Sequence, residues 1–182
     1  MIELIKLASN SKTRPDTIAQ LGASFDEWFP LYEIITPNRI AAFISQAAIE
    51  TCYFNYFTEL GNKEYFQKYE PNTSIGKILG NKFPGDGYKY RGRGIFQLTG
   101  RANHVSFGKR LGVDLENHPE LGAEIPLATH IACQFWKDRR LNSYADTKDI
   151  KEITRRINGG MNAYDKRKNM FDKLLGAGGN QN

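Results

Sequence analysis

The chain has 182 residues, of which 40 % are hydrophobic, 12 % aromatic and 25 % charged. This composition excludes a disordered chain, because the apolar content suffices for a core, and the length favours one domain. Lysine and arginine exceed aspartate and glutamate by 25 − 20 = 5 charges, and the isoelectric point is near 9.1. A basic chain favours polyanionic partners such as nucleic acid, anionic lipid surfaces or acidic envelope polymers.

The N-terminal segment and the cysteine content indicate synthesis in the cytosol. The segment MIELIKLASNSKTRPD lacks a basic stretch followed by a long apolar run, so it does not resemble a signal peptide. No apolar run approaches the ~20 residues of a membrane span. Two cysteines, Cys52 and Cys133, do not suggest a disulfide framework. We therefore expect a protein that stays in the cytosol until something else releases it.

Local signals in the first fifty residues predict three successive helices. A short one is expected over Ile2 to Ala8, and Pro15 opens a longer one that Pro30 kinks or ends. Thr36 as N-cap and Pro37 at the first helical position begin the third. The apolar positions of this third helix are Ile40, Phe43, Ile44, Ala47 and Ala48.

The rest of the chain predicts shorter elements. Residues 51–62 are aromatic and roughly alternating, which indicates extended or irregular structure. Helical turns are expected at 63–69 and 75–79, followed by a loop over 80–90 with room for a small hairpin. Later helices are expected from Thr99 to Leu111, from Pro126 to Arg139, from Asp146 or Thr147 to Ile157, and from Tyr164 to Leu175.

The most informative stretch is YKYRGRGIFQLTGRAN, from Tyr88 to Asn103, because no packing rule requires these residues in this order. Gly92 and Gly94 permit backbone geometries and close approaches that a side chain would block. Directional hydrogen-bonding groups accompany them, namely Arg91, Arg93, Gln97, Thr99 and Asn103. Such groups beside aromatic rings suit a sugar polymer.

With Glu50 upstream and INGG (Ile157 to Gly160) downstream, this motif resembles glycoside hydrolase family 19, and in particular its short, lysozyme-like phage endolysins. The resemblance spans roughly Thr36 to Leu175. It implies a mainly α, single-domain, lysozyme-like fold with a substrate groove and at most a small hairpin. It also implies hydrolysis of β-1,4 glycosidic bonds of bacterial peptidoglycan (muramidase activity), without a cofactor, for lysis of a host cell.

The chain shows no linker, internal repeat or low-complexity block. We therefore expect residues 1–182 to form one catalytic domain, with a flexible tail at about 176–182 and no separate cell-wall-binding module. A monomer is expected, held in the host cytoplasm until its release to the periplasm and cell wall. The basic residues of the last helix, Lys166, Arg167, Lys168 and Lys173, either contact the anionic envelope or form an ordinary solvated face.

Hydrolysis of a glycosidic bond needs one carboxyl that protonates the leaving oxygen and a second, ionised one that activates water. Glu50 is the candidate acid, because its apolar neighbours in the sequence favour the uncharged form. The helix dipole also disfavours a purely structural carboxylate at this helix end.

The resemblance places the second carboxylate at Glu59, nine positions further on (59 − 50). Glu70 is the rival, because plant-type chitinases place their base at a comparable distance. An inverting enzyme needs carboxyl groups about 6.5 to 9.5 Å apart, and the short link from Glu50 favours Glu59.

Four further residues, Gln97, Thr99, Asn103 and Asn158, match family positions that hydrogen-bond the sugar or hold the attacking water. Thr99 stands where many members have Ser, which keeps the hydroxyl. Helix capping and surface polarity are the structural alternatives for Thr99 and Asn103.

Tyr90 and Arg93 are also candidates for substrate contact. Tyr90 either stacks on a sugar face or packs in the core, and Arg93 either meets peptidoglycan carboxylates or holds the catalytic acids. Arg167 matches a family arginine and is expected to be a scaffold ion-pair partner. The histidines lack metal-ligand spacing, so no metal site is expected.

Three alternatives stay open. Chitinase is the closest, because chitin shares the β-1,4-linked N-acetylglucosamine backbone. A non-catalytic peptidoglycan-binding protein is motivated by Ile49, since family members usually have His directly before the acid. A nucleic-acid binder would explain RGRG and its nearby tyrosines but leaves Glu50 and INGG unexplained, so no nucleic-acid partner is expected.

Overall fold

The computed structural model describes residues 1–178 and is mainly helical, as predicted. The predicted hairpin is reduced to two isolated antiparallel bridges, Thr58 to Arg93 and Arg93 to Leu98. Contacts divide the chain into two compact units. The terminal unit comprises Met1–Tyr56 and the chain from Ala132 onward, and the middle unit is Phe57–Ile131. The expectation of one catalytic domain stays a prediction.

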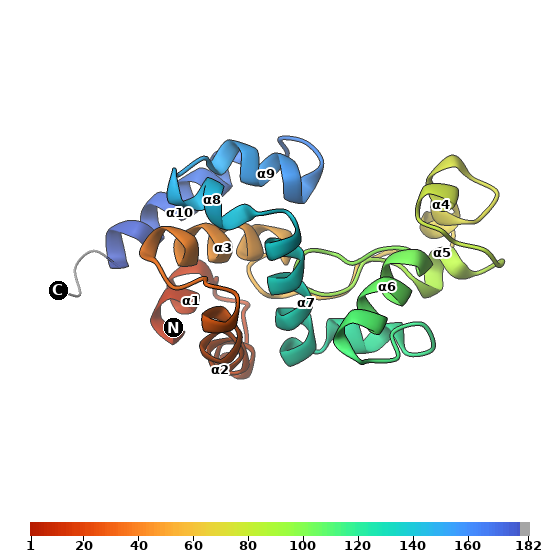
Figure 1. Ribbon diagram of the computed structural model, residues 1–182, viewed down its shortest axis with the longest axis horizontal. Helices are drawn as coiled ribbons and strands as arrows, with labels where there is room; N and C mark the ends of the chain where they lie inside the picture. Colours follow the sequence, from red (N-terminus) through yellow and green to blue (C-terminus); the bar gives the residue numbers. More distant parts are fainter. Residues whose placement is uncertain (179–182) are drawn as a thin grey trace. The chain divides into compact units, whose positions relative to one another are not determined.

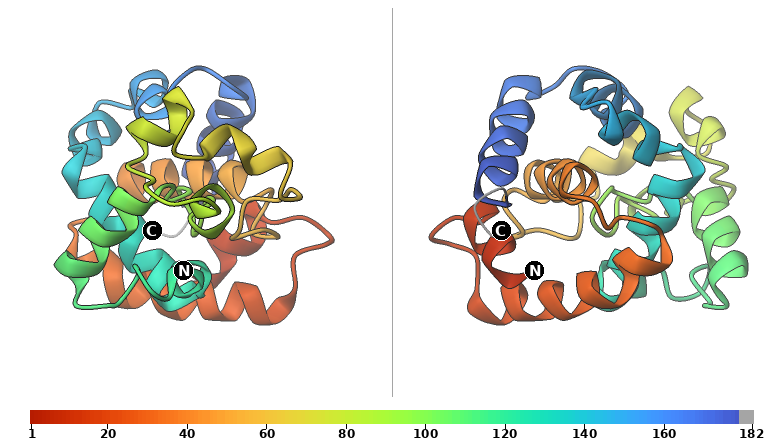
Figure 2. Two further views of the ribbon diagram at one scale, coloured as in Figure 1. Left: turned by 90° about the vertical axis from the view of Figure 1, so that its right-hand side faces the viewer. Right: turned by 60° about the vertical axis from the view of Figure 1, so that its left-hand side comes forward.

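Helix α3 occupies the centre of the terminal unit. The helices of this unit are α1 (Ile2–Ala8), α2 (Pro15–Leu31), α3 (Pro37–Glu50), α8 (Leu141–Asp146), α9 (Ile150–Asn158) and α10 (Tyr164–Gly178). Helix α3 contacts α1, α8, α9 and α10 (Figure 1). Figure 2 shows α10 beside both α1 and α3, so the first and last helices of the described residues meet.

The start and the packing of α3 follow from its sequence. The Thr36 hydroxyl accepts a hydrogen bond from the Arg39 amide at 3.3 Å, as an N-cap does. All eight positions from Ala41 to Ala48 are buried. The Phe43 ring contacts Phe29 and Trp136 with ring centroids 4.9 and 5.1 Å apart. Aromatic pairs of this kind add about 0.5 to 1.5 kcal/mol beyond burial, so α3 is a rigid support for its C-terminal residue.

The middle unit consists of short helices and irregular segments. Its elements are η1 (Tyr65–Tyr69), α4 (Ser74–Ile78), α5 (Asp86–Lys89), α6 (Arg101–Leu111) and η2 (Pro119–Ala123). Helix α7 (Ile125–Asp138) continues from this unit into the terminal unit. The 3-10 helix η1 contacts α4 and α5 and buries Phe66, whose ring lies 5.7 Å from that of Tyr88.

Helix α5 corrects the predicted loop over 80–90. Asp86 begins this helix and accepts hydrogen bonds from the amides of Lys82 and Phe83 at 2.8 and 3.1 Å. Arg101 binds the same carboxylate in bidentate fashion, with both N–O distances at 2.8 Å. The hydrogen bonds from Arg101 and the two amides outweigh burial and lower the pKa of Asp86. A partner fifteen positions away therefore fixes this turn.

Other boundaries also differ from the sequence prediction. Helix α6 begins at Arg101, after Gly100, and α8 lies where no helix was predicted. Asp149, rather than Asp146 or Thr147, caps α9 by accepting from the Glu152 amide at 3.0 Å.

Helix α10 extends to Gly178, so the part of the predicted tail at 176–178 is helical. Residues 179–182 lie outside the described part of the chain. Within residues 1–178, no helix is both long and apolar enough to cross a membrane.

Candidate active site

Glu50 is the last residue of α3, and its side chain is 13 % exposed. The guanidinium of Arg167, from α10, donates a hydrogen bond to Glu50 Oε1 at 2.6 Å. Arg167 itself is only 2 % exposed. The sequence predicted apolar surroundings for Glu50, and the structure corrects this by placing a buried cation beside it. A buried guanidinium stabilises the carboxylate that remains after a proton has been donated.

A polar network fixes this arginine between three helices. Arg167 Nη1 donates to Gln46 Oε1 at 2.8 Å, and its Nε donates to the Asn162 carbonyl at 3.1 Å. The Gln46 amide in turn donates to the Thr154 hydroxyl on α9 at 3.2 Å. Sequence analysis predicted Arg167 as an ion-pair partner but missed Gln46. Its position four residues before Glu50, on the same helix face, was the available signal.

A left-handed turn follows Glu50 directly. Cys52, Tyr53 and Phe54 have φ angles of 50°, 63° and 64°, which non-glycine residues rarely adopt. The Thr51 hydroxyl accepts from the Phe54 amide at 2.9 Å, and the Thr13 hydroxyl donates to the Tyr53 carbonyl at 2.7 Å. The turn ends α3 immediately after the candidate acid and fixes the direction in which the chain leaves.

Asn158 and the basic residues of α10 lie in the same unit. Asn158 is the last residue of α9, half-buried, one turn after Thr154 and therefore on the same helix face. The predicted basic surface of α10 needs correction, because Arg167 is buried against Glu50. Lys168 pairs with Asp172, and Lys173 donates to the Leu7 carbonyl at 2.9 Å.

Glu59 lies in the middle unit, in the irregular segment before η1. The Tyr69 hydroxyl donates to Glu59 Oε1 at 3.0 Å, and the Gly92 amide donates to Oε2 at 3.1 Å. Its own amide donates to the Gly92 carbonyl at 2.8 Å. Burial and the Glu59 carboxylate raise the pKa of Tyr69, so this hydroxyl keeps its proton and remains a donor. The carboxylate is therefore held in one orientation from two sides.

Glu70 also accepts two hydrogen bonds, but both come from backbone amides at the start of α5. Its Oε2 accepts from the Gly85 amide at 2.8 Å and its Oε1 from the Gly87 amide at 3.2 Å. A Cβ atom on Gly87 would lie 2.8 Å from Oε1, so the loop packs tightly on this carboxylate. Both oxygens of Glu70 thus hold the turn that leads into α5, which is a structural role.

The side chains of Gln97 and Glu59 both lie close to the Cα atom of Gly92. A Cβ atom on Gly92 would lie 2.4 Å from Gln97 Oε1 and 3.2 Å from Glu59 Oε2. Glycine is needed here for close approach, while Gly94 also has a positive φ of 78°. Gln97 has a φ of 52° and donates from Nε2 to the Gly94 carbonyl at 2.9 Å. The motif therefore brings a carboxylate and an amide oxygen together.

Thr99 and Asn103 have internal partners near the start of α6. The Thr99 hydroxyl donates to the Gln97 carbonyl at 2.9 Å, and the Asn103 amide donates to the Thr99 carbonyl at 2.7 Å. These bonds leave the acceptor capacity of the hydroxyl and of the Asn103 amide oxygen available to a ligand.

Tyr90 and Arg93 are buried, with 0 % and 5 % exposure. The Tyr90 hydroxyl donates to the Glu116 carbonyl at 2.8 Å, and its ring lies 5.3 Å from that of His104. A ring without a free face does not stack on sugar, so we assign Tyr90 to the core. Arg93 Nη1 donates to the Arg91 carbonyl at 3.1 Å. Burial, reinforced by the Arg91 charge, lowers the pKa of Arg93 to about 10, so it remains a buried cation at neutral pH.

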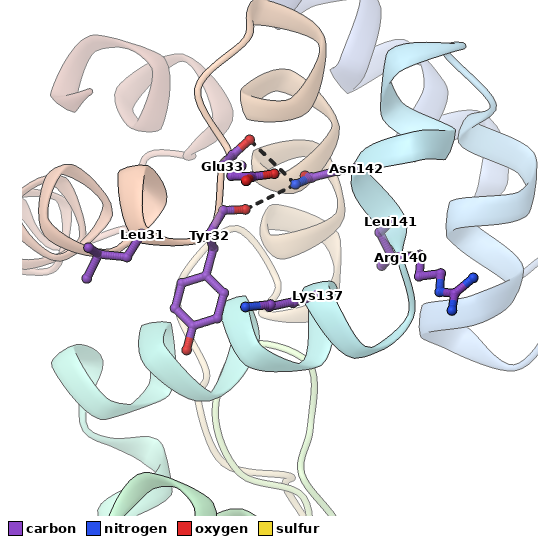
Figure 3. Close-up of a pocket in the computed structure, with 7 residues that line it drawn as sticks. All are labelled: Leu31, Tyr32, Glu33, Lys137, Arg140, Leu141 and Asn142. Atoms are coloured by element: carbon purple, nitrogen blue, oxygen red, sulfur yellow. Dashed lines mark hydrogen bonds between the residues drawn. The ribbon is translucent and has the colours of Figure 1, made fainter.

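A separate pocket of about 140 Å³ lies in the terminal unit, where the turn after α2 meets the joint between α7 and α8. Figure 3 shows the Asn142 amide directed at the main-chain carbonyls of Tyr32 and Glu33. Its oxygen accepts from Trp136 Nε1 at 2.8 Å. The lining has one carboxyl group, that of Glu33, so it offers no pair of acids. Among the described residues, no cluster of His, Cys, Asp or Glu is placed to hold a metal ion.

A mainly helical protein with one hydrogen-bonded glutamate in each unit, of which Glu59 lies beside the motif that contains Gln97, fits the class of glycoside hydrolases. No protein-family model matches the chain. A glycosyl hydrolase family 19 domain-containing protein of Haemophilus influenzae is 32 % identical over 159 residues, which cover 74 % of this chain and 78 % of that protein. An endochitinase of Arabidopsis thaliana is 29 % identical over 135 residues, and the match covers 74 % of this chain but 44 % of the plant protein.

Solved structures share the fold. A bacterial family 19 chitinase superposes with a TM-score of 0.66 at 20 % identity, covering 96 % of this chain and 92 % of that one. Chitinase C from Streptomyces griseus gives a TM-score of 0.65 at 20 % identity, covering 96 % and 74 %. This chain belongs to glycosyl hydrolase family 19 and is a glycoside hydrolase. The predicted family and enzyme class are thereby confirmed.

Proposed function

We propose that this family 19 hydrolase is an endolysin of the muramidase type, which cleaves β-1,4 glycosidic bonds of bacterial peptidoglycan to lyse a host cell. The observation that carries the proposal is the contrast between two glutamates. Glu50 bonds a buried guanidinium at 2.6 Å, whereas Glu59 is oriented by a hydroxyl and an amide and has only the half-exposed Lys68 ammonium 3.9 Å away. The two carboxyl groups therefore differ in their surroundings, and the reaction needs two ordered carboxyl groups with different roles.

In the proposed mechanism, Glu50 protonates the leaving oxygen, and Arg167 stabilises the carboxylate that results. Glu59 removes a proton from water, which attacks the anomeric carbon from the opposite face and inverts its configuration. Tyr69 and Gly92 direct the Glu59 oxygens toward that water, and Gln97 supplies a polar group beside them. Thr99, Asn103 and Asn158 are proposed sugar contacts, and no cofactor is required.

The substrate proposal rests on charge. The chain carries a formal charge of +5, which favours a polymer that bears carboxylates. Peptidoglycan has such groups on its stem peptides and on lactyl groups that carry no peptide, whereas chitin is uncharged. We propose a monomeric protein held in the host cytoplasm and released to the cell wall during lysis.

Chitinase activity is the second candidate, because a relative of this chain is named as an endochitinase and the compared structures are chitinases. A non-catalytic wall-binding protein is the third, motivated by Ile49 in place of histidine before Glu50. The three differ in what they release from purified polymers.

The test is digestion of purified peptidoglycan and of chitin oligomers by wild type and single variants, followed by mass spectrometry and reducing-end analysis. The variants are Glu50→Gln, Glu59→Gln and Glu70→Gln, with Glu64→Gln as an exposed, matched control. We expect muropeptides with reducing N-acetylmuramic acid, and losses of about 10²- to 10⁴-fold in kcat for the first two variants.

The expected loss in Glu70→Gln is in the free energy of unfolding, because Glu70 holds a turn. Circular dichroism separates that effect from a loss of catalysis. Release of chitin fragments alone would establish chitinase, and pelleting with the wall without any product would establish the binding protein. Wild-type rates in Glu50→Gln would contradict the mechanism.

A further inference from the structure

A cleft of about 340 Å³ opens in the middle unit, beside the segment that holds Glu59. Residues of η1, of α5 and of the turns before them line it, among them Lys63, Gln67, Glu70, Pro84, Tyr88 and Lys89. The mechanism proposed above uses none of these side chains. The cleft combines an aromatic ring, an amide and two ammonium groups, so it offers several polar contacts to a ligand.

The two lysines of the cleft have no acidic partner among the described residues. Lys63 Nζ lies 5.9 Å from the centroid of the Tyr88 ring, and Lys89 Nζ lies 5.1 Å from that of Tyr90. Both side chains are exposed, so both ammonium groups can reach a ligand. Outside the lining, the Arg91 guanidinium lies 4.1 Å from the centroid of the Tyr88 ring.

Glu70 is the one acidic residue of the lining, and its carboxylate is occupied by hydrogen bonds to the backbone. Each of its oxygens accepts a backbone amide, from Gly85 at 2.8 Å and from Gly87 at 3.2 Å. The two lysines therefore outweigh it, and the formal charge of the lining is 2 − 1 = +1. A cleft with free ammonium groups and an occupied carboxylate favours an anionic ligand.

The cleft and the candidate base share η1. Gln67 and Tyr69 belong to this short helix, and Tyr69 donates to Glu59 while Gln67 lines the cleft. On the other side, Arg91 contacts the Tyr88 ring and directly precedes Gly92, which donates to Glu59. A sugar strand bound at Glu59 would thus carry its substituents past the cleft.

We propose that this cleft binds a carboxylate carried by the peptidoglycan strand, with Lys63 and Lys89 as its charged contacts and the Tyr88 ring as an apolar wall. The inference rests on the proposed function. The carboxylate belongs either to the stem peptide or, where no peptide is attached, to the free lactyl group of N-acetylmuramic acid, and both present the same chemistry to the lysines. Uncharged chitin has no such group, so the cleft would set the preference between the two polymers.

The test measures binding separately from hydrolysis, by calorimetric titration with three ligands. They are the peptidoglycan disaccharide with its tetrapeptide, the same disaccharide without peptide, and uncharged diacetylchitobiose. We expect Lys63→Gln/Lys89→Gln to weaken binding of the peptide-bearing form about tenfold relative to chitobiose. The matched control, Lys77→Gln/Lys82→Gln, removes the same charge from exposed lysines outside the cleft and should change this ratio less than about twofold.

The peptide-free disaccharide identifies the source of the carboxylate. The cleft also accepts a free lactyl carboxylate if this disaccharide shows the full effect, and it accepts only the carboxylates of the stem peptide if the disaccharide shows none. Lys63→Arg/Lys89→Arg should restore the preference, because it restores both charges. Equal losses in the two glutamine pairs, or an unchanged ratio, would overturn the inference.

A parallel digestion by wild type separates the two proposals. If wild type releases muropeptides but the Lys63→Gln/Lys89→Gln pair leaves the binding ratio unchanged, only the inference about the cleft is refuted. The absence of muropeptide release refutes the proposed function, and the cleft inference falls with it.

Discussion

Gly92 is the residue on which the geometry of the candidate base depends. Glu59 and Gln97 both reach the space that a side chain at this position would occupy. Its φ is not positive, so its importance lies in contact distance and not in backbone freedom. A single methyl group therefore acts on two functional side chains at once.

We expect Gly92→Ala to lower kcat by about 10- to 100-fold, because displacements near 1 Å at a reacting group have effects of this size. The protein should remain folded, since both neighbours are side-chain ends that can move. Steady-state kinetics on peptidoglycan, with circular dichroism, would check this. Gly176→Ala is the matched control, because a Cβ there meets no atom within 4 Å. Wild-type rates for Gly92→Ala would contradict the described contact.

Sequence reasoning found the glutamates, the glycines and Arg167, but it did not find Tyr69. The glutamates, the glycines and Arg167 could be identified because the spacing and types of these residues can be read from the sequence alone. Tyr69 reaches Glu59 only because η1 turns back toward the segment at Glu59, ten positions earlier. Tyr90 and Arg93 were proposed as ligands since their types suit sugar and carboxylate, but burial of both side chains is a property of the folded chain.

At the level of elements, the left-handed turn at Cys52, Tyr53 and Phe54 is the least expected feature. The sequence has no glycine at these three positions, so nothing in it signals positive φ angles. Strain of about 1 to 2 kcal/mol per residue is typical for this conformation. The hydrogen bonds to Thr51 and Thr13 offset part of it.

Substitutions at the exposed Cys52 test this strain. We expect Cys52→Gly to raise the free energy of unfolding by about 0.5 to 1 kcal/mol, since glycine relieves the steric cost but orders a more flexible chain. Cys52→Val should lower it by about 1 kcal/mol, because a branched side chain fits this region poorly. Urea unfolding of both variants measures the difference. Equal stabilities would mean that the turn is not left-handed in solution.

A helix boundary could be predicted where residues within one turn determine it, as at the start of α3. It could not be predicted where a residue distant in the sequence determines it, as at α5. Helix α3 begins where its N-cap and proline place it, because those signals act within one turn. Helix α5 depends on Arg101, fifteen positions from Asp86, and such a contact leaves no local pattern. The start of α9 is a different case, because its cap is local: Asp149 accepts from the Glu152 amide three positions on, and the predicted choice of Asp146 or Thr147 was wrong.

On the scale of the whole molecule, His104 makes stability depend on pH. Its side chain is fully buried, with Nδ1 2.9 Å from the Gly100 carbonyl. Burial lowers its pKa to about 4, from an ordinary value of 6.5. Between these values the unfolded chain binds a proton that the folded protein does not bind, so stability falls as the pH falls.

We expect the wild type to lose up to about 3 kcal/mol of unfolding free energy between pH 6.5 and pH 4 through this residue. His104→Gln should flatten that dependence, whatever its effect on absolute stability. Urea unfolding at several pH values would show the difference in slope. An unchanged slope in His104→Gln would refute the assignment.

The ion pair between Glu50 and Arg167 joins residues 117 positions apart in the chain. Chains are synthesised from the N-terminus, and helix α3 leaves the ribosome long before α10 exists. Until then, the candidate acid has no guanidinium beside it, and the Gln46 network lacks its central member. The surroundings of the candidate acid therefore stay incomplete until α10 has been made, and this later helix assembles them.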